Sequence, residues 1–384
     1  MLDNLDQSII KNLNRSRILR AFREKEIIQK KELVDSLNLS ITTVTTNTRR
    51  LLEEGLIEET GIAESTGGRK PVVFKFIKSA KVSFGVDLSP HQATIIMTNL
   101  ASEIIDRSKF SIDKQSMEEV LLNIQTIVET LLDKHGYLKA DCLGIGLSLP
   151  GIVDCENIML VNAPNLKVKN YSFRYFEATI GLKVYIENEA NVAAFAELII
   201  GAAEKLDDAV YISITDGVGC GIIANHKVTK GTFNKAGEFG HMRISDKEII
   251  CSCGRTGCWE IFSSERALLK FYTEQSGDIV TDLEAFFKIY HEGNLLAKVA
   301  LRKYLDYLLI GIENIMLGLD PEVIILGGEI VNFLREIEPI VEDYMKKNHS
   351  DILSRDNKLV LSTISPYSAV VGSSLLPMKE MFGY

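Results

Sequence analysis

The stretch that decides the fold runs from Ala236-Gly237-Glu238-Phe239-Gly240-His241 to Cys251-Ser252-Cys253-Gly254-Arg255-Thr256-Gly257-Cys258-Trp259-Glu260. It places one imidazole ahead of three closely spaced thiols, a set that can close a tetrahedral zinc shell. The alternative is that these cysteines form disulfides or are ordinary buried thiols. That alternative must explain why three of the six cysteines fall within eight positions and bracket two glycines. We therefore expect a structural Zn²⁺ held by His241, Cys251, Cys253 and Cys258.

Length and composition predict a folded chain of two or three domains. Its 384 residues exceed one ordinary core, and 46% of them are hydrophobic. The sequence lacks an apolar run of about 18 residues, so no membrane span is expected. Residues 1–6 lack the cationic and apolar regions of an export signal, and clustered thiols are at risk in an oxidising compartment. We expect a cytoplasmic protein.

The charge is distributed unevenly along the chain. The net charge of −9 argues against a surface that binds nucleic acid all over. Residues 1–80 nevertheless carry 14 Lys and Arg against 11 Asp and Glu, a net charge of +3, while residues 81–384 carry −12. This places any attraction to phosphate at the amino end, although a solvated charged surface has a similar composition.

Two helical patterns near the amino terminus, residues 31–37 and 40–52, form a pair. Ser40 is the expected N-cap of the second helix, and Gly55 is expected to stop it. Apolar side chains at helical spacing predict a shared buried face. These are Leu33, Val34, Leu37, Ile41, Val44 and Leu51.

The opposite face of the second helix carries short hydroxyls and one cation, as a helix in the major groove of DNA would. They are Thr42, Thr43, Thr45, Thr46 and Arg49. A polar, solvent-facing surface on a small helical module is the competing interpretation. Threonine is a mediocre helix former, which favours a functional reason for the run.

The next segment favours DNA binding. Residues 56–59 and 72–76 are typical of two strands, joined by Ser65-Thr66-Gly67-Gly68-Arg69-Lys70-Pro71. A helix pair followed by such a hairpin is a winged helix-turn-helix pattern. Arg69 and Lys70 at the wing tip are suited to a narrow minor groove, whose negative potential attracts cations.

From Val82 onward, short β-rich runs alternate with long helical patterns, which predicts two α/β lobes with a cleft between them. The spacing of Thr281 and Glu284 predicts a capping box. Expected strands are residues 82–87, 93–97, 143–148, 184–187, 209–214, 220–224 and 323–326. Expected helices are residues 117–134, 281–291 and 295–317.

The quoted glycine-rich and cysteine-rich stretch resembles the signature of the ROK family (repressor, open reading frame, kinase). Four further motifs fall in the family's order: Pro150-Gly151-Ile152-Val153-Asp154, Ala163-Pro164-Asn165-Leu166, Asn188-Glu189-Ala190-Asn191 and Leu326-Gly327-Gly328. The resemblance implies a two-lobe, actin-like (sugar kinase and ribonuclease H-like) α/β domain over residues 81–384. The winged helix-turn-helix domain occupies residues 1–80, as in repressors of xylose or N-acetylglucosamine genes.

The resemblance further implies a sugar in the cleft. Carboxylates and amides suit such a ligand, because each sugar hydroxyl both donates and accepts a hydrogen bond. One ring nitrogen of His241 would bind zinc and leave the other for a hydroxyl. An alternative interpretation of Glu238 and Glu260 is that they are acidic surface residues. For Asn165 the alternative is a structural role in a turn. The implied sugar-binding residues are Gly151, Asn165, Asn188, Glu189, Glu238, His241 and Glu260.

The sequence departs from the family's kinases at both phosphate loops and at the catalytic base. Asp87 is followed by Leu88-Ser89-Pro90-His91 where kinases have Asp-x-Gly-Gly-Thr, so an amide donor and the glycines are missing. Asp216 stands beside the second loop in place of a threonine, and its charge opposes phosphate. Glu189 replaces the catalytic aspartate, and its extra methylene shifts the carboxylate by about an ångström, which can cost on the order of 100-fold. These changes predict that kinase activity is lost.

The resulting hypothesis is a sugar-responsive repressor that binds palindromic operator DNA as a homodimer or higher homo-oligomer, with helices after Leu295 as the candidate interface. Because Glu189 is a form associated with xylose-repressor-like members, xylose is the first effector to test, followed by glucose. The alternative is an ATP-dependent sugar kinase that carries a DNA-binding domain. A protein-binding scaffold has no motif of its own.

Overall fold

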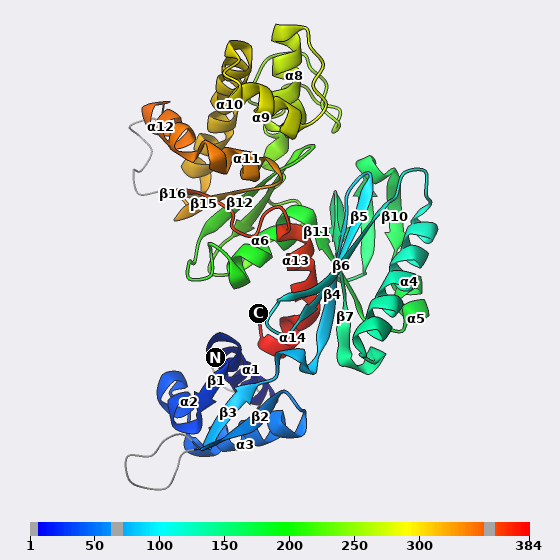
Figure 1. Ribbon diagram of the computed structural model, residues 1–384, viewed down its shortest axis with the longest axis vertical. Coiled ribbons are helices and arrows are strands. Elements are labelled where there is room, and N and C mark those ends of the chain that lie inside the picture. The colour runs from blue at the N-terminus through cyan, green and yellow to red at the C-terminus, as the bar shows by residue number, and fades with distance from the viewer. Residues whose placement is uncertain (1–6, 63–71, 349–357) are drawn as a thin grey trace.

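The computed structural model describes residues 7–62, 72–348 and 358–384, and its chain begins with a small DNA-binding-type module (Figure 1). The helices of this module pack on a sheet in which β3 pairs antiparallel with both β1 and β2. Ser40 caps α3 by accepting the Thr43 amide at 3.1 Å, as predicted. The winged helix-turn-helix prediction is confirmed. The elements are α1 (Gln7–Lys25), β1 (Ile27–Gln29), α2 (Lys30–Leu37), α3 (Ile41–Glu53), β2 (Ile57–Ile62) and β3 (Val72–Phe76).

One prediction for this module is wrong, and another concerns residues that the structure does not describe. Ile41 was predicted on the buried face of α3, but its side chain is 56% exposed because the first turn of the helix projects beyond the core that Val44 and Leu51 enter. Arg69 and Lys70 lie outside the described residues.

The first lobe is built on a mixed sheet with strand order β11-β7-β4-β5-β6. The predicted hairpin is present, since β4 and β5 pair antiparallel, while β7 runs parallel to both β4 and β11. Helices α4 and α5 bury their apolar faces against one side of the sheet. The bounds are β4 (Val82–Leu88), β5 (Gln92–Asn99), β6 (Ile104–Ser111), α4 (Met117–His135), β7 (Cys142–Leu149), α5 (Arg174–Ile180) and β11 (Val184–Asn188).

The second lobe contains a sheet of order β14-β13-β12-β15-β16. Helices from the later part of the chain cover its outer side and form a second hydrophobic core. The long α10 helix approaches the rest of that core closely, because a Cβ at Gly311 would lie 1.9 Å from the Trp259 indole. The strands are β12 (Ala209–Ile214), β13 (Val218–Ile223), β14 (Val228–Thr229), β15 (Val323–Gly327) and β16 (Lys358–Leu361). The helices are α7 (Glu260–Ser263), α8 (Glu265–Ser276), α9 (Leu283–His291), α10 (Leu295–Leu319), α11 (Ile330–Glu336) and α12 (Glu338–Asn348).

Two helices, α6 (Glu189–Ile200) and α13 (Ser368–Leu375), pack against each other between the two sheets (Figure 1). Glycines allow the close approach, since a Cβ at Gly372 would lie 1.9 Å from the carbonyl oxygen of Val192. On the first sheet, a Cβ at Gly146 would lie 1.9 Å from the carbonyl oxygen of Ser373. The α6–α13 pair therefore holds the two lobes together, and α14 (Lys379–Phe382) continues from it to the end of the chain.

Three further features complete the fold. A small antiparallel sheet of β8 (Ile152–Asp154), β9 (Met159–Ala163) and β10 (Val168–Ser172) follows β7. The predicted capping box at Thr281 is wrong: Asp282 is the N-cap of α9 and accepts the Ala285 amide at 2.8 Å. Asp282 takes this place because its carboxylate is a strong acceptor one residue nearer the helix.

Among the described residues, no helix is long and apolar enough to cross a membrane.

Candidate functional site

A cleft of about 550 Å³ opens between the two lobes and is lined mainly by polar side chains and loop backbone. All seven residues that the family resemblance implied for a sugar line this one cleft. Gly151, Asn165, Asn188 and Glu189 come from the first lobe and the start of α6. Glu238, His241 and Glu260 come from the second lobe. The structure thus brings together residues separated by more than 100 positions in the chain.

Asn188 shapes the floor of the cleft where α6 begins. Its side-chain oxygen accepts the amides of Ala190 and Asn191, which makes it the N-cap of the helix. Its side-chain nitrogen donates to the Gly151 carbonyl oxygen at 2.8 Å. A Cβ at Gly151 would lie 2.2 Å from the Asn162 carbonyl oxygen, and Gly151 has a φ of +87°, so glycine is required there. The Asn188 side chain therefore ties the start of α6 to the loop that follows β7.

Glu189 is a half-buried acid in the wall of the cleft. Its carboxylate accepts a hydrogen bond from Ser213 Oγ at 3.4 Å. Burial, and next the charge of nearby Asp87, raise the pKa of Glu189 to about 7. Asp87 accepts a hydrogen bond from Ser148 Oγ at 2.6 Å, and burial raises its pKa as well. Burial therefore raises the pKa of both carboxyl groups on this side of the cleft.

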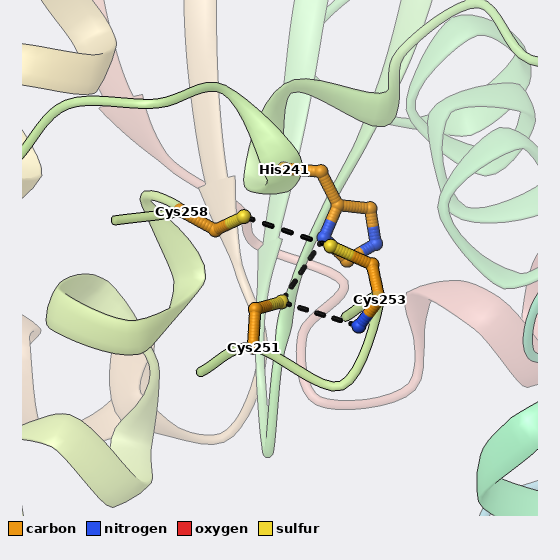
Figure 2. A group of neighbouring side chains, drawn as sticks. All are labelled: His241, Cys251, Cys253 and Cys258. Carbon is orange, nitrogen blue, oxygen red and sulfur yellow. Dashed lines mark hydrogen bonds between the residues drawn. The ribbon is translucent and has the colours of Figure 1, made fainter. Parts of the chain in front are cut away.

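One imidazole and three thiols converge beside the cleft (Figure 2). The donor atoms of His241, Cys251, Cys253 and Cys258 all lie within 4.8 Å of one another. His241 Nδ1 lies 3.5 Å from Cys251 Sγ, and Cys253 Sγ lies 3.7 Å from Cys258 Sγ. Local desolvation raises the pKa of the Cys253 thiol, but hydrogen bonds with Arg255 and the neighbouring thiols outweigh it and bring the pKa down to about 7. This donor set fits a tetrahedral metal ion.

The cluster is anchored to both the second lobe and the cleft. Trp259, next to Cys258, is fully buried and donates its indole N–H to the Tyr307 carbonyl oxygen of α10 at 2.9 Å. Glu260, the next residue, turns back to accept from Ser252 Oγ at 3.1 Å. His241 directs Nδ1 at the thiols, and its other ring nitrogen lies 3.7 Å from the Glu238 carboxylate. His241 therefore links the cluster to the cleft wall.

The second glycine-rich loop, between β12 and β13, is held by a side chain from α8. Arg266 donates from Nε and Nη2 to the Asp216 carbonyl oxygen at 2.9 and 2.6 Å. Its Nε also lies 3.5 Å from the Asp216 carboxylate. Nearby, burial and then the charge of Glu329 raise the pKa of Glu265 to about 8. The carboxyl groups of Asp216, Glu265 and Glu329 therefore lie around this loop, and the Arg266 guanidinium is bonded to it.

Sequence reasoning missed some of the residues that line the cleft. Asn191 was quoted within a motif without a role, yet it is 6% exposed and lines the cleft. Within the described part of the chain, its side-chain oxygen is buried without a hydrogen-bond partner. Its place three residues after Asn188 could have signalled a second amide on the same side of α6. Asn162, Lys235, Ser252 and Arg255 also line the cleft.

Only some of the residues that were predicted to form the DNA-binding face of α3 are exposed in the structure. Thr42, Thr46 and Arg49 are exposed, and their spacing places them on one side of the helix. Thr43 and Thr45 are only half-buried, and each hydroxyl has an internal partner: Ser40 Oγ for Thr43 and the Ile41 carbonyl oxygen for Thr45.

Comparison with known proteins agrees with both parts of the chain. The ROK family profile matches residues 83–380, and a winged helix-turn-helix DNA-binding profile matches residues 11–58. The xylose repressor of Bacillus spizizenii is 31% identical over 99% of this chain and 98% of its own length. The N-acetylglucosamine repressor of Escherichia coli O157:H7 is 24% identical over 100% of this chain and 96% of its own.

Solved structures resemble the chain in the same way. A ROK family transcriptional regulator described as a homologue of the E. coli Mlc protein superposes with a TM-score of 0.82, at 25% identity, over 97% of each chain. A ROK family glucokinase from Streptomyces griseus, solved with glucose and AMPPNP, superposes with a TM-score of 0.69, at 23% identity, over 77% of this chain and 98% of its own. The glucokinase shows that the two-lobe part has the actin-like sugar-kinase fold.

Proposed function

We propose, from the premise that this chain belongs to the ROK family, that it is a transcriptional repressor whose operator binding changes when a sugar occupies the cleft. Residues 1–80 would bind DNA, and residues 81–384 would bind the effector. The xylose repressor that matches nearly the whole chain supports this proposal and makes D-xylose the first effector to test.

The observation that carries the proposal is the composition of the cleft within a chain that also has a winged helix-turn-helix module. Amide groups from Asn165 and Asn188 face carboxylates from Glu189, Glu238 and Glu260 around one cavity. A sugar hydroxyl pairs well with such groups, because it donates to the carboxylate and accepts from the amide. The excess of carboxylates favours a neutral sugar over an anionic one.

The groups near the phosphate loops support a protein without kinase activity. Pro90 and Asp216 both line the cleft where a kinase of this fold needs amide donors and no negative charge. Arg266 is engaged with Asp216 and is therefore not free to bind a phosphate. Glu189 sits in the position of the family's catalytic aspartate, but its side chain is one methylene longer, and its carboxylate accepts a hydrogen bond from Ser213 Oγ.

We also propose that the His241, Cys251, Cys253 and Cys258 cluster holds a structural Zn²⁺. Three thiolates and one imidazole leave no open coordination position, which is typical of a structural site rather than a catalytic one. When bound, the ion would tie the segment from His241 to Cys258 into one unit. This would fix the ring of His241, whose other nitrogen is directed at Glu238.

A homodimer is the proposed state on DNA, because one small recognition helix contacts too few base pairs for useful specificity. The long α10 helix presents several exposed apolar side chains that suit contact with a second copy. These are Leu295, Leu296, Val299, Ile310, Leu317 and Leu319. Sedimentation of the purified protein would test this, with Val299→Glu expected to shift a dimer toward monomer.

Two measurements on purified protein test the proposed function. A thermal-shift screen of monosaccharides should show a rise in melting temperature with D-xylose or another aldose, since a ligand that binds the native state stabilises it. Operator duplexes obtained by selection from random DNA should bind the protein, and the effective sugar should change that affinity. Operator binding that no tested sugar changes would contradict the proposal.

A kinase assay decides between the repressor and the sugar kinase. The protein would be incubated with ATP, magnesium and the same aldoses, with Glu189→Ala as the control. We expect the two proteins to be equally inactive. Sugar phosphorylation above the Glu189→Ala background would overturn the assignment of a repressor without enzymatic activity.

A further inference from the structure

We propose that the last residues of the chain form a clamp that transmits occupancy of the cleft to the DNA-binding module. The C-terminal clamp is defined here as Phe382 and Tyr384 together with Arg23 of α1. This inference rests on the proposed function and adds the route by which sugar binding reaches DNA.

The clamp joins the two ends of the chain in space (Figure 1). The Arg23 guanidinium donates a hydrogen bond to the Tyr384 hydroxyl and lies 5.6 Å from the centre of the Tyr384 ring. It also lies 5.2 Å from the Phe382 ring, which is fully buried and stacks on Tyr384. Cation–π contacts of this kind are stronger where water is excluded.

Two more contacts hold α1 to the sugar-binding part. Ser16 Oγ donates to the Met381 carbonyl oxygen at 3.2 Å, and Arg23 Nη2 donates to Ser102 Oγ at 2.7 Å. Phe22 of α1 belongs to the same buried hydrophobic cluster as Phe382 and Phe195. The DNA-binding module is therefore packed onto the second part of the chain and is not simply tethered to it.

The clamp also touches the helix that begins in the cleft. Tyr384 packs edge-to-face on Phe195 of α6, with ring centres 6.2 Å apart, and Lys379 Nζ lies 4.2 Å from the Phe195 ring. The first residue of α6 is Glu189, and Asn188 caps it. Phe195 follows Glu189 by six positions in the helix, a distance of about 9 Å along the axis. One rigid helix thus connects the cleft to Tyr384.

The physical consequence is a short mechanical connection between two sites. A sugar that bonds to Asn188 or Glu189 favours one position of the α6 start, and a helix transmits a small shift along its length. Tyr384 would follow Phe195, and Arg23 would follow Tyr384, so α1 and the recognition helix packed on it would change their orientation. Coupling of this kind requires each ligand to distinguish two arrangements of one element, and in this proposal the clamp is that element.

The test compares the coupling between D-xylose and operator DNA in the full-length parent and in Tyr384→Ala. Operator affinity is measured with and without saturating D-xylose, and D-xylose affinity is measured without DNA. We expect D-xylose to change operator affinity about fivefold or more in the parent. In Tyr384→Ala this factor should fall below about twofold, while D-xylose affinity without DNA stays within about threefold of the parent value.

Two further variants make the result specific. Arg107→Ala is the matched control and should keep the parent factor, because Arg107 of β6 donates to the hydroxyl of Tyr367, next to α13, at 3.1 Å and so forms an Arg–Tyr pair that does not include a residue of α1. Tyr384→Phe keeps the ring but loses the hydroxyl, so it should give an intermediate factor even if the alanine variant is too unstable to measure. A Tyr384→Ala or Tyr384→Phe protein with the full parent factor would overturn the clamp. A parent that binds operator but ignores D-xylose would instead contradict the proposed function with this sugar.

Discussion

Glu189 lies at the start of α6, where a buried carboxyl group meets the charge of Asp87. Its raised pKa, about 7, means that the folded protein holds this proton more tightly than the unfolded chain does. Between pH 4.5 and about 7, the carboxyl group ionises readily in the unfolded chain, whereas in the folded protein its ionisation is opposed. The unfolded state is therefore favoured more and more as the pH rises through this range. The contribution of Glu189 to the free energy of unfolding is therefore largest at acidic pH and is lost as the pH rises to about 7.

Glu189→Gln should remove this pH-dependent cost. We expect the variant to raise the free energy of unfolding by about 2 kcal/mol more at pH 8 than at pH 5. Denaturant unfolding at the two pH values measures this difference. Glu156→Gln, which changes an exposed acid, should have an equal effect at both pH values. An effect of Glu189→Gln that does not depend on pH would contradict the buried, protonated state.

Cys258 tests the metal cluster because its side chain is fully buried beside Trp259. Cys258→Ser should abolish one equivalent of bound zinc and lower the melting temperature by several degrees, since the binding energy of a structural ion is also folding energy. Metal analysis and thermal unfolding after zinc loading measure both effects. Cys142→Ser, a thiol outside the cluster, should keep its zinc. Stoichiometric zinc in Cys258→Ser would remove that residue from the ligand set.

The recognition helix α3 allows a similarly direct test. Arg49 is exposed on the same side as Thr42 and Thr46. If it contacts a phosphate, Arg49→Ala should weaken operator binding about tenfold and reduce the slope of log affinity against log salt by about 1. Lys288→Ala, an exposed cation on α9, should leave both quantities unchanged. An unchanged salt slope in Arg49→Ala would show that this side of α3 does not face the DNA backbone.

Helices with one buried face were predictable from the sequence, and the helix α13, which is buried almost all round, was not. The α3 helix has a cap, a stop and a periodic apolar stripe, so its place and the exposure of Thr42 and Thr46 could be predicted. Helix α13 reads Ser368-Ala369-Val370-Val371-Gly372-Ser373-Ser374-Leu375, and nearly all of it is buried. It has no polar face to produce a helical period, so the helix that holds the lobes together was missed.

Residues of the candidate site likewise fall into two groups, those that the sequence could predict and those that only the structure shows. Clustered thiols and quoted motifs marked His241 and Glu260, because chemistry restricts which residues can serve there. Lys235 and Arg255 line the cleft because of the way in which the second lobe meets the first. Such contacts depend on long-range packing between residues far apart in the chain, which local patterns do not encode.

The two lobes are also joined by a charged bridge beside the cleft. Lys230, which follows β14 of the second lobe, lies 2.5 Å from the Glu187 carboxylate on β11 of the first lobe. The same ammonium group lies 3.2 Å from Cys155 Sγ. The Glu187 side chain is only 6% exposed, and it also accepts the Asn188 amide at 2.9 Å. A buried pair of this kind is costly to break from one side, even when its net contribution is small.

Lys230→Met keeps most of the packing of the lysine chain but leaves Glu187 buried without its cation. We expect it to lower the free energy of unfolding by about 3 kcal/mol, measured by denaturant titration. Adding Glu187→Gln should recover much of the loss, because the amide needs no counter-charge. Lys347→Met, which removes an exposed ion pair with Asp343, should cost no more than about 1 kcal/mol. If Lys230→Met cost as little as Lys347→Met, the bridge would not hold the lobes, and the α6–α13 contact alone would set their arrangement.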